Sequence, residues 1–191
     1  MNENKQGSDP SHEVYISVDV ETSGPTPGEY SLLSMGACAV NDDSQTFECL
    51  VKPISDKADP KALSITGFSL EELRSDGTDP IEAMRLFGDW VKKTSENGTA
   101  VFVGLNAGFD WSFINYYFHT YTGTNPFGFA PLDIKSLYMG ATGCSWHDTR
   151  SSRMVAELNP RNTGNHNALT DARAQAELFR LILLRIKNSA K

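Results

Sequence analysis

The order in which strand-like and helix-like segments follow one another constrains the fold of this chain most. Three segments rich in apolar and β-branched residues come first, at 14–20, 30–40 and 45–52. A meander is expected there, because only the polar turn at 41–43 separates the last two. Helical and strand-like patterns then alternate at 80–93, 100–104, 109–121, 132–134, near 136, and at 169–187. This order predicts an α/β fold with a mixed β-sheet, a three-strand meander plus parallel strands, flanked by helices.

Local signals set the helix boundaries. In Asp79-Pro80-Ile81-Glu82, an Asp cap precedes a Pro at the first helical position, and Glu82 stands where a capping box requires an acid. The last helix has one apolar stripe at steps of three and four, which predicts a face turned to the core. Its members are Leu169, Ala172, Ala176, Phe179, Leu183 and Ile186. Residues 140–166 are polar and Gly-rich, and we expect them to form a mobile loop.

Length and composition indicate one domain. The chain has 191 residues, enough for a core that needs no disulfide or metal. Residues 1–12 are polar without an apolar stretch, so we expect a disordered tail and a single domain over 13–191. No apolar run is long enough to span a bilayer. The three cysteines are scattered and form no CxxC pair, which favours a reducing cytoplasm.

The net charge of −7, from 17 basic and 24 acidic residues, argues against a protein that coats long duplexes through a basic surface. It leaves room for an enzyme that gathers carboxylates around metal ions, since bound cations offset such a charge.

Two carboxylates end the first strand. Asp19 and Glu21 are two residues apart, so alternation points both to one face of the sheet. Like charges this close disfavour ionisation, and a hard divalent cation such as Mg²⁺ or Mn²⁺ removes the conflict. For this pair alone, two solvent-facing acids at a strand end would be the simpler interpretation.

Three more residues stand at the ends of predicted elements. Asp110 follows the strand at 100–104, where α/β folds cluster their ligands, although Asp is also a common helix cap. Asp171 lies in the first turn of the last helix, where an acid also favours the helix dipole. His166 precedes that helix in a loop; His147, in the expected mobile loop, is its weaker rival.

Together these residues form three motifs in order: Asp19-Val20-Glu21-Thr22, Asn106 to Asp110, and His166 to Asp171 with HxAxxD spacing. The chain thereby resembles the DEDDh branch of the 3′–5′ exonucleases, which have a ribonuclease H-like fold. The segment NAGFDWSF and Asn125-Pro126-Phe127 are most similar to ribonuclease T. The histidine that many members place before their first large helix is replaced here by Thr66.

The resemblance implies a metal-dependent 3′–5′ exonuclease that releases nucleoside 5′-monophosphates from single-stranded RNA or DNA. Two Mg²⁺ or Mn²⁺ ions would be held by Asp19, Glu21, Asp110 and Asp171, with His166 as general base. It also implies substrate contacts from the backbone near Val20 and Thr22 and from Asn106. Phe109 is a candidate for stacking on an unpaired base. Relatives are often homodimers, but the sequence leaves this open, together with the choice between RNA and DNA.

Two alternatives remain at this point. A module of the same fold could bind nucleic-acid ends without cleaving them, although all five catalytic positions are filled. A phosphatase with an aspartyl nucleophile would require a second Asp where Glu21 stands, and is disfavoured.

Overall fold

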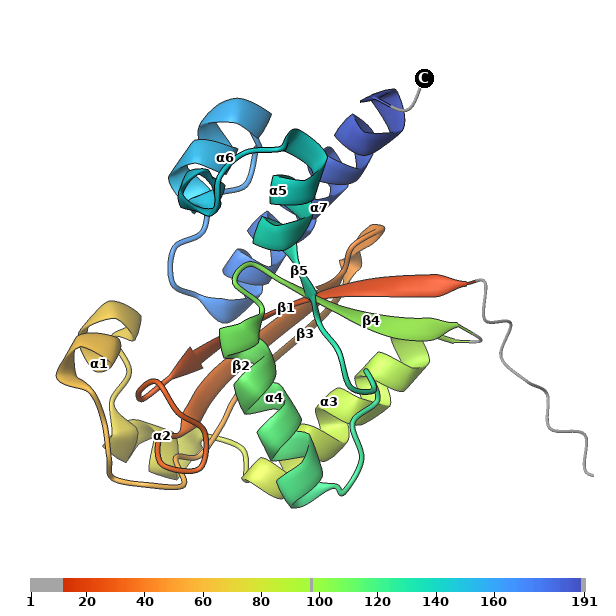
Figure 1. Cartoon of the computed structure of the whole chain (residues 1–191). Helices are drawn as coiled ribbons and strands as arrows, with labels where there is room; N and C mark the ends of the chain where they lie inside the picture. The colour runs from red at the N-terminus through yellow and green to blue at the C-terminus, as the bar shows by residue number, and fades with distance from the viewer. Residues whose placement is uncertain (1–11, 97, 190–191) are drawn as a thin grey trace, which may run out of the picture.

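A computed structural model describes residues 12–96 and 98–189 and contains one five-stranded sheet (Figure 1). The order is β3-β2-β1-β4-β5, and β1 pairs antiparallel with β2 and parallel with β4. The strands are β1 (Glu13–Thr22), β2 (Leu32–Ala39), β3 (Asp42–Leu50), β4 (Thr99–Gly104) and β5 (Leu132–Asp133). The prediction of a meander followed by parallel strands is confirmed.

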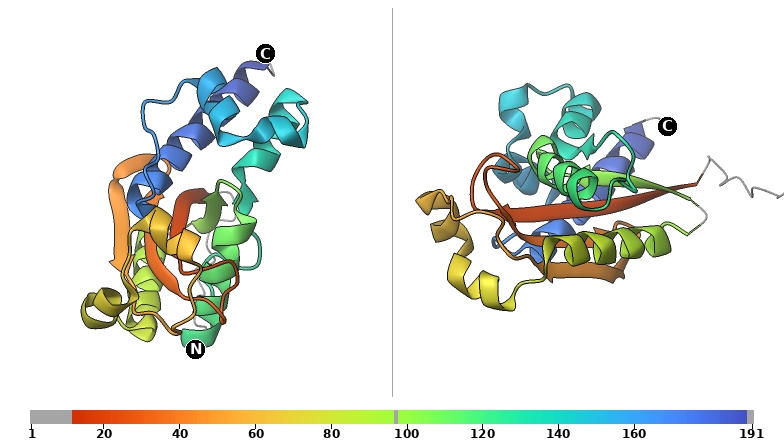
Figure 2. Two further views of the ribbon diagram at one scale, coloured as in Figure 1. Left: turned by 90° about the vertical axis from the view of Figure 1, so that its left-hand side faces the viewer. Right: turned by 90° about the horizontal axis from the view of Figure 1, so that it is seen from below.

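Helices cover both faces of this sheet (Figures 1 and 2). They are α1 (Pro60–Thr66), α2 (Leu70–Asp76), α3 (Pro80–Thr94), α4 (Gly108–Tyr121), α5 (Ile134–Thr142), the short 3₁₀ helix η1 (Trp146–Thr149), α6 (Ser151–Leu158) and α7 (Ala168–Ser189). Helices α3 and α4 lie on one face, and α5 and α7 lie on the other.

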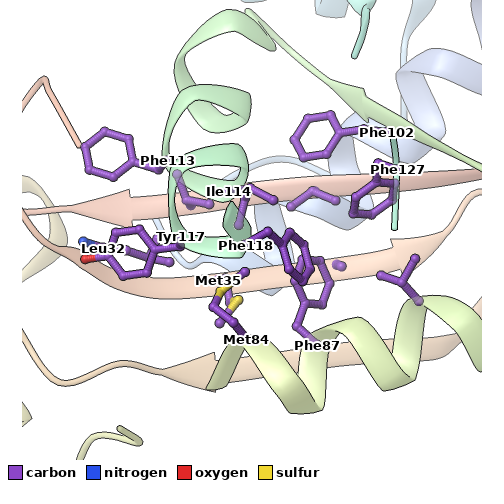
Figure 3. Close-up of a cluster of buried hydrophobic side chains, with 14 of the residues drawn as sticks. Leu32, Met35, Met84, Phe87, Phe102, Phe113, Ile114, Tyr117, Phe118 and Phe127 are labelled. Atoms are coloured by element: carbon purple, nitrogen blue, oxygen red, sulfur yellow. Dashed lines mark hydrogen bonds between the residues drawn. The ribbon is translucent and has the colours of Figure 1, made fainter. Parts of the chain in front are cut away.

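The strand residues alternate between two cores. Ile16, Val18 and Val20 of β1 face α3 and α4, where Phe87, Phe113, Tyr117 and Phe118 are fully or almost fully buried (Figure 3). Tyr15 points to the opposite face, where its ring packs against Phe179 of α7. The same alternation carries Asp19 and Glu21 to the α7 face, as the sequence predicts.

The expectation of a loop over 140–166 is wrong for residues 140–158, which are mostly helical, whereas residues 159–166 form no helix or strand. Helix α5 continues to Thr142, and η1 and α6 follow. Met154 of α6 is fully buried in the α7-side core, and Asn159 ends α6 in a left-handed conformation. Helix α6 has only eight residues and Arg150 at its N-cap provides no side-chain cap, so it lacks the start signal that marks residues 79–82.

Helices α1 and α2 were also missing from the predicted elements, although their start signals are present. Asp59 caps α1 ahead of Pro60, repeating the Asp-Pro signal at residues 79–80. Ser69 caps α2 by accepting a hydrogen bond from the Glu72 N–H.

Residues 1–11 of the expected tail lie outside the described residues. His12 is described, and its carbonyl accepts the Thr99 N–H at 2.9 Å. Within the described ranges, no helix combines the length and the apolar character that crossing a bilayer requires.

Candidate active site

Asp19 and Glu21 reach the site because β1 continues beyond its last paired position with β4, where Ser17 lies opposite Val103. The strand ends with an irregularity in its pairing with β2 between Glu21 and Thr22. Both acids are partly buried, and their alternation with Val18 and Val20 fixes them on the α7 side.

Gly36 brings α7 onto the sheet at this point. It is the direct cross-strand partner of Asp19. A Cβ at Gly36 would lie 2.2 Å from the Leu169 backbone nitrogen, so only glycine allows this close approach. The first turn of α7 therefore rests on β2, and Asp171 comes to the end of β1.

Asp110 approaches from the other side of the sheet. It lies in the first turn of α4, is 5% exposed, and accepts the Val20 N–H through Oδ1 at 3.0 Å. The cap position of α4 is Ala107, so the interpretation of Asp110 as a helix cap is wrong. Its carboxylate instead fixes the backbone between Asp19 and Glu21.

The loop before α7 is held by two carboxylates of that helix. Asp171 accepts the N–H groups of Asn165 and His166, at 2.7 and 3.1 Å. Six residues further along α7, Glu177 accepts the N–H groups of Arg161 and Asn162. His166 has a φ of +62° and is exposed. The predicted histidine thus stands on an open loop whose backbone is nonetheless anchored.

Burial and neighbouring carboxylates raise the pKa values of Asp19, Glu21 and Asp110. Burial, and then the charges of Asp110, Glu21 and Asp171, raise the pKa of Asp19 well above its usual range. Burial and the nearby Asp171 charge raise the pKa of Glu21 to about 7. Burial raises the pKa of Asp110 to about 7 against the lowering effect of its backbone hydrogen bonds. Within the described ranges, no Lys or Arg forms a salt bridge with any of these acids.

A cluster of carboxylates that forms no salt bridge with Lys or Arg in the described ranges is suited to binding divalent cations. One ligand atom from each of Glu21, His166 and Asp171 can be chosen so that all three lie within 4.8 Å of one another. Carboxylate oxygens suit Mg²⁺ and Mn²⁺, whose charge would offset the repulsion that raises these pKa values.

A cavity of about 450 Å³ opens beside the acids. Asp19, His166 and Asp171 line one side, and Ser151 and Val155 of α6 line another. Helix α6 therefore forms a wall of the site, which the expectation of a mobile loop did not foresee.

Two further polar residues, Gln175 and Asp133, belong to the site and were not predicted. Gln175 Nε2 donates to Asp19 Oδ1 at 2.6 Å, and its Oε1 accepts the Leu105 N–H at 2.8 Å. Asp133 Oδ2 accepts the Ala107 N–H and so fixes the loop before α4. The available signal for Gln175 was a polar residue one turn after Asp171, beside the apolar stripe of α7.

The predicted substrate residues divide into buried and open groups. Val20 and Thr22 are buried, and the Thr22 hydroxyl donates to the Gly24 carbonyl. Asn106 is exposed in a left-handed conformation. Phe109 is 36% exposed, with its ring centroid 5.4 Å from that of the fully buried Phe113.

A family model described as Exonuclease matches residues 16–179. The chain belongs to this exonuclease family. It is 57% identical over 171 residues to the 3′–5′ DNA exonuclease Cap18 of Escherichia coli, covering 89% of this chain and 91% of that protein.

Solved exonucleases share the fold. The nuclease domain of 3′hExo, a DEDDh family member bound to rAMP, has a TM-score of 0.69 at 15% identity, covering 91% of this exonuclease and 93% of that chain. E. coli Exonuclease I in complex with a dT13 oligonucleotide has a TM-score of 0.70 at 18% identity. The match covers 94% of this exonuclease and 43% of that chain. The expectation of a 3′–5′ exonuclease is confirmed by the family model and by the 57% identity. The expected fold is confirmed by the structural match, which includes a DEDDh family member.

Proposed function

We propose that this exonuclease degrades single-stranded DNA from its 3′ end and releases nucleoside 5′-monophosphates. The observation that carries the proposal is the convergence of Asp19, Glu21, Asp110 and Asp171 beside His166, with the pKa of three of the acids raised. DNA is favoured over RNA by the 57% identity to a protein named a 3′–5′ DNA exonuclease.

The four carboxylates would hold two Mg²⁺ or Mn²⁺ ions. When bound, such ions lower the pKa of a coordinated water and stabilise charge on the attacking and leaving oxygens. The protein's part is to keep the carboxylates in place. Asp110 is fixed by the Val20 N–H, and Asp171 by the Asn165 and His166 N–H groups.

His166 would act as the general base that takes the proton from the attacking water. Its ring has a nitrogen within 4.8 Å of carboxylate oxygens of Glu21 and Asp171. The exposed loop leaves the imidazole accessible to water and substrate, while the two backbone hydrogen bonds to Asp171 hold its register against α7.

Phe109 and Asn106 would contact the terminal nucleotides. Phe109 offers part of its ring to solvent at the start of α4, next to Asp110. A base stacked on such a ring contributes about 1–3 kcal/mol to binding. Val20 and Thr22 would shape the floor of the nucleotide site through their backbone, because their side chains are buried.

The decisive experiment follows matched single strands of DNA and RNA labelled at the 5′ or the 3′ end, with Mn²⁺ and with chelator. We expect chelator-sensitive shortening from the 3′ end, mononucleotide products and faster decay of DNA. Binding of ends without shortening would instead favour a non-catalytic end-binding module. Equal decay of RNA and DNA would contradict the DNA preference alone.

Localisation and assembly follow as smaller proposals. The three free cysteines, of which Cys38 and Cys49 are buried, are compatible with a reducing cytoplasm. A homodimer stays a prediction, which sedimentation at several protein concentrations would test.

A further inference from the structure

Gln175 occupies an unusual place between two parts of the site. It lies on α7 one turn after Asp171 and is only 6% exposed. A buried amide with unpaired ends would be costly, so its partners matter. Both ends are satisfied, one by the Asp19 carboxylate and one by the Leu105 backbone at the end of β4.

The chain itself fixes which end of the amide meets Asp19. The Leu105 N–H can only donate, so it must face the amide oxygen of Gln175. The –NH₂ group then points at Asp19 Oδ1, 2.6 Å away. Gln175 therefore acts as a donor to the carboxylate, and this orientation does not depend on an arbitrary choice between the O and N of the amide.

This contact links the segments that carry the three motifs. Asp19 belongs to the first motif, Leu105 directly precedes the second at Asn106, and Gln175 shares α7 with Asp171 of the third. One side chain thus joins β1, the end of β4 and α7 at the point where the four carboxylates meet.

We propose that Gln175 is a positioning residue that holds the Asp19 carboxylate in the orientation required for binding a divalent cation. The proposal rests on the metal site of the proposed function. Hydrogen-bonded partners behind a metal ligand typically change metal affinity or activity by about 10–100-fold when they are removed. The donated hydrogen bond also fills one lone pair of Oδ1 and leaves the other oxygen of Asp19 for a cation.

The test substitutes Gln175→Met, which keeps similar length and removes the donor. Mn²⁺ is the probe, with two readouts: the Mn²⁺ concentration for half-maximal cleavage and the rise in melting temperature that Mn²⁺ causes. We expect the half-saturating concentration to rise about 10-fold or more, a smaller Mn²⁺-induced rise in melting temperature, and recovery of turnover at high Mn²⁺.

A matched control, Ile182→Val, removes one methylene from the buried face of the same helix without touching Asp19. It should lower the melting temperature while leaving the half-saturating Mn²⁺ concentration unchanged. If Gln175→Met behaves like this control, or loses turnover with normal Mn²⁺ saturation, Gln175 serves packing only and the proposal is overturned.

The thermal readout separates this inference from the proposed function. If the wild-type protein cleaves no nucleic acid but is stabilised by Mn²⁺, and Gln175→Met weakens that stabilisation, the positioning role holds and the proposed function fails. If the wild-type protein cleaves DNA and both readouts are unchanged in Gln175→Met, the proposed function holds and the positioning role fails.

Discussion

The two sides of the proposed active site differ in how they are buried and held. On the sheet side, Asp19 and Asp110 are enclosed and tied to Gln175 and to the Val20 backbone. On the α7 side, His166 is exposed and is held through backbone hydrogen bonds to Asp171. On the enclosed side the buried carboxylates repel one another, and a bound cation would relieve that repulsion. On the open side the His166 imidazole stays accessible to water. A nuclease requires both.

Replacing the acid on each side should abolish cleavage with opposite effects on the metal-free fold. Asp110→Asn keeps an oxygen for the Val20 N–H and removes a buried charge, so the melting temperature at pH 8 should rise. Asp171→Asn turns an –NH₂ group toward one of two backbone N–H groups, so the melting temperature should fall. Calorimetry without metal, with assays in Mn²⁺, checks both. Equal shifts in melting temperature would contradict the distinction between the two sides.

The open side carries His166, the proposed general base, so removing its imidazole should slow cleavage without affecting the fold. His166→Asn suits the left-handed backbone at this position. We expect turnover to fall about 10²–10⁴-fold, the usual contribution of a positioned base, with an unchanged melting temperature. His147→Asn, on η1, is the control and should keep normal turnover. The reverse result would mean that His147 is the base.

Gly36 lies where α7 contacts the sheet beside Asp19, and a single methyl group there should push α7 away from the sheet. Gly36→Ala places a Cβ against the α7 backbone, and overpacking of this kind costs about 1–3 kcal/mol of stability. Denaturant unfolding measures the loss, and cleavage should fall as well. The control is Gly140→Ala, where the added Cβ meets nothing within 4 Å. A Gly36→Ala protein as stable as wild type would show that α7 shifts freely.

The enclosed side also predicts how stability depends on pH. Without metal, Glu21 and Asp110 keep their protons up to a pH of about 7 in the folded state, whereas in the unfolded chain they release them near pH 4. The folded state binds more protons between these values, so stability should fall as the pH rises from about 4 to 7. Thermal melts with and without Mn²⁺ test this. A decline that Mn²⁺ does not reduce at pH 7 would contradict it.

The smallest effect should come from the far anchor of the loop. Glu177→Ala frees the Arg161 and Asn162 N–H groups, while Asp171 still holds Asn165 and His166. We expect turnover to fall less than about 10-fold, because the hydrogen bonds to Asp171 limit how far His166 can shift. A smaller shift of a catalytic group costs less activity. Glu177→Gln keeps one acceptor oxygen, so its turnover should lie between those of the wild type and Glu177→Ala. Faster proteolysis within 159–166 in Glu177→Ala would confirm the loosened loop.

The sequence predicted the sheet because it rests on local signals, whereas the catalytic set came from three motifs in order and stays a prediction. Period-two alternation placed Asp19 and Glu21 on one face, and the stripe of α7 placed Asp171 near it. Helix α6 was missed because it is short and its N-cap residue, Arg150, provides no capping side chain. Gln175 was missed because its partners, Asp19 and Leu105, are distant in the chain. Helices α1 and α2 could have been predicted from Asp59-Pro60 and Ser69.

Gly36 has a consequence for how this enzyme can vary. The helix that carries Asp171 meets the strand beside Asp19 through main-chain atoms, so at this point the distance between the first and last motifs is set by the backbone. An engineer seeking a heat-resistant version should therefore leave this glycine unchanged and place substitutions elsewhere.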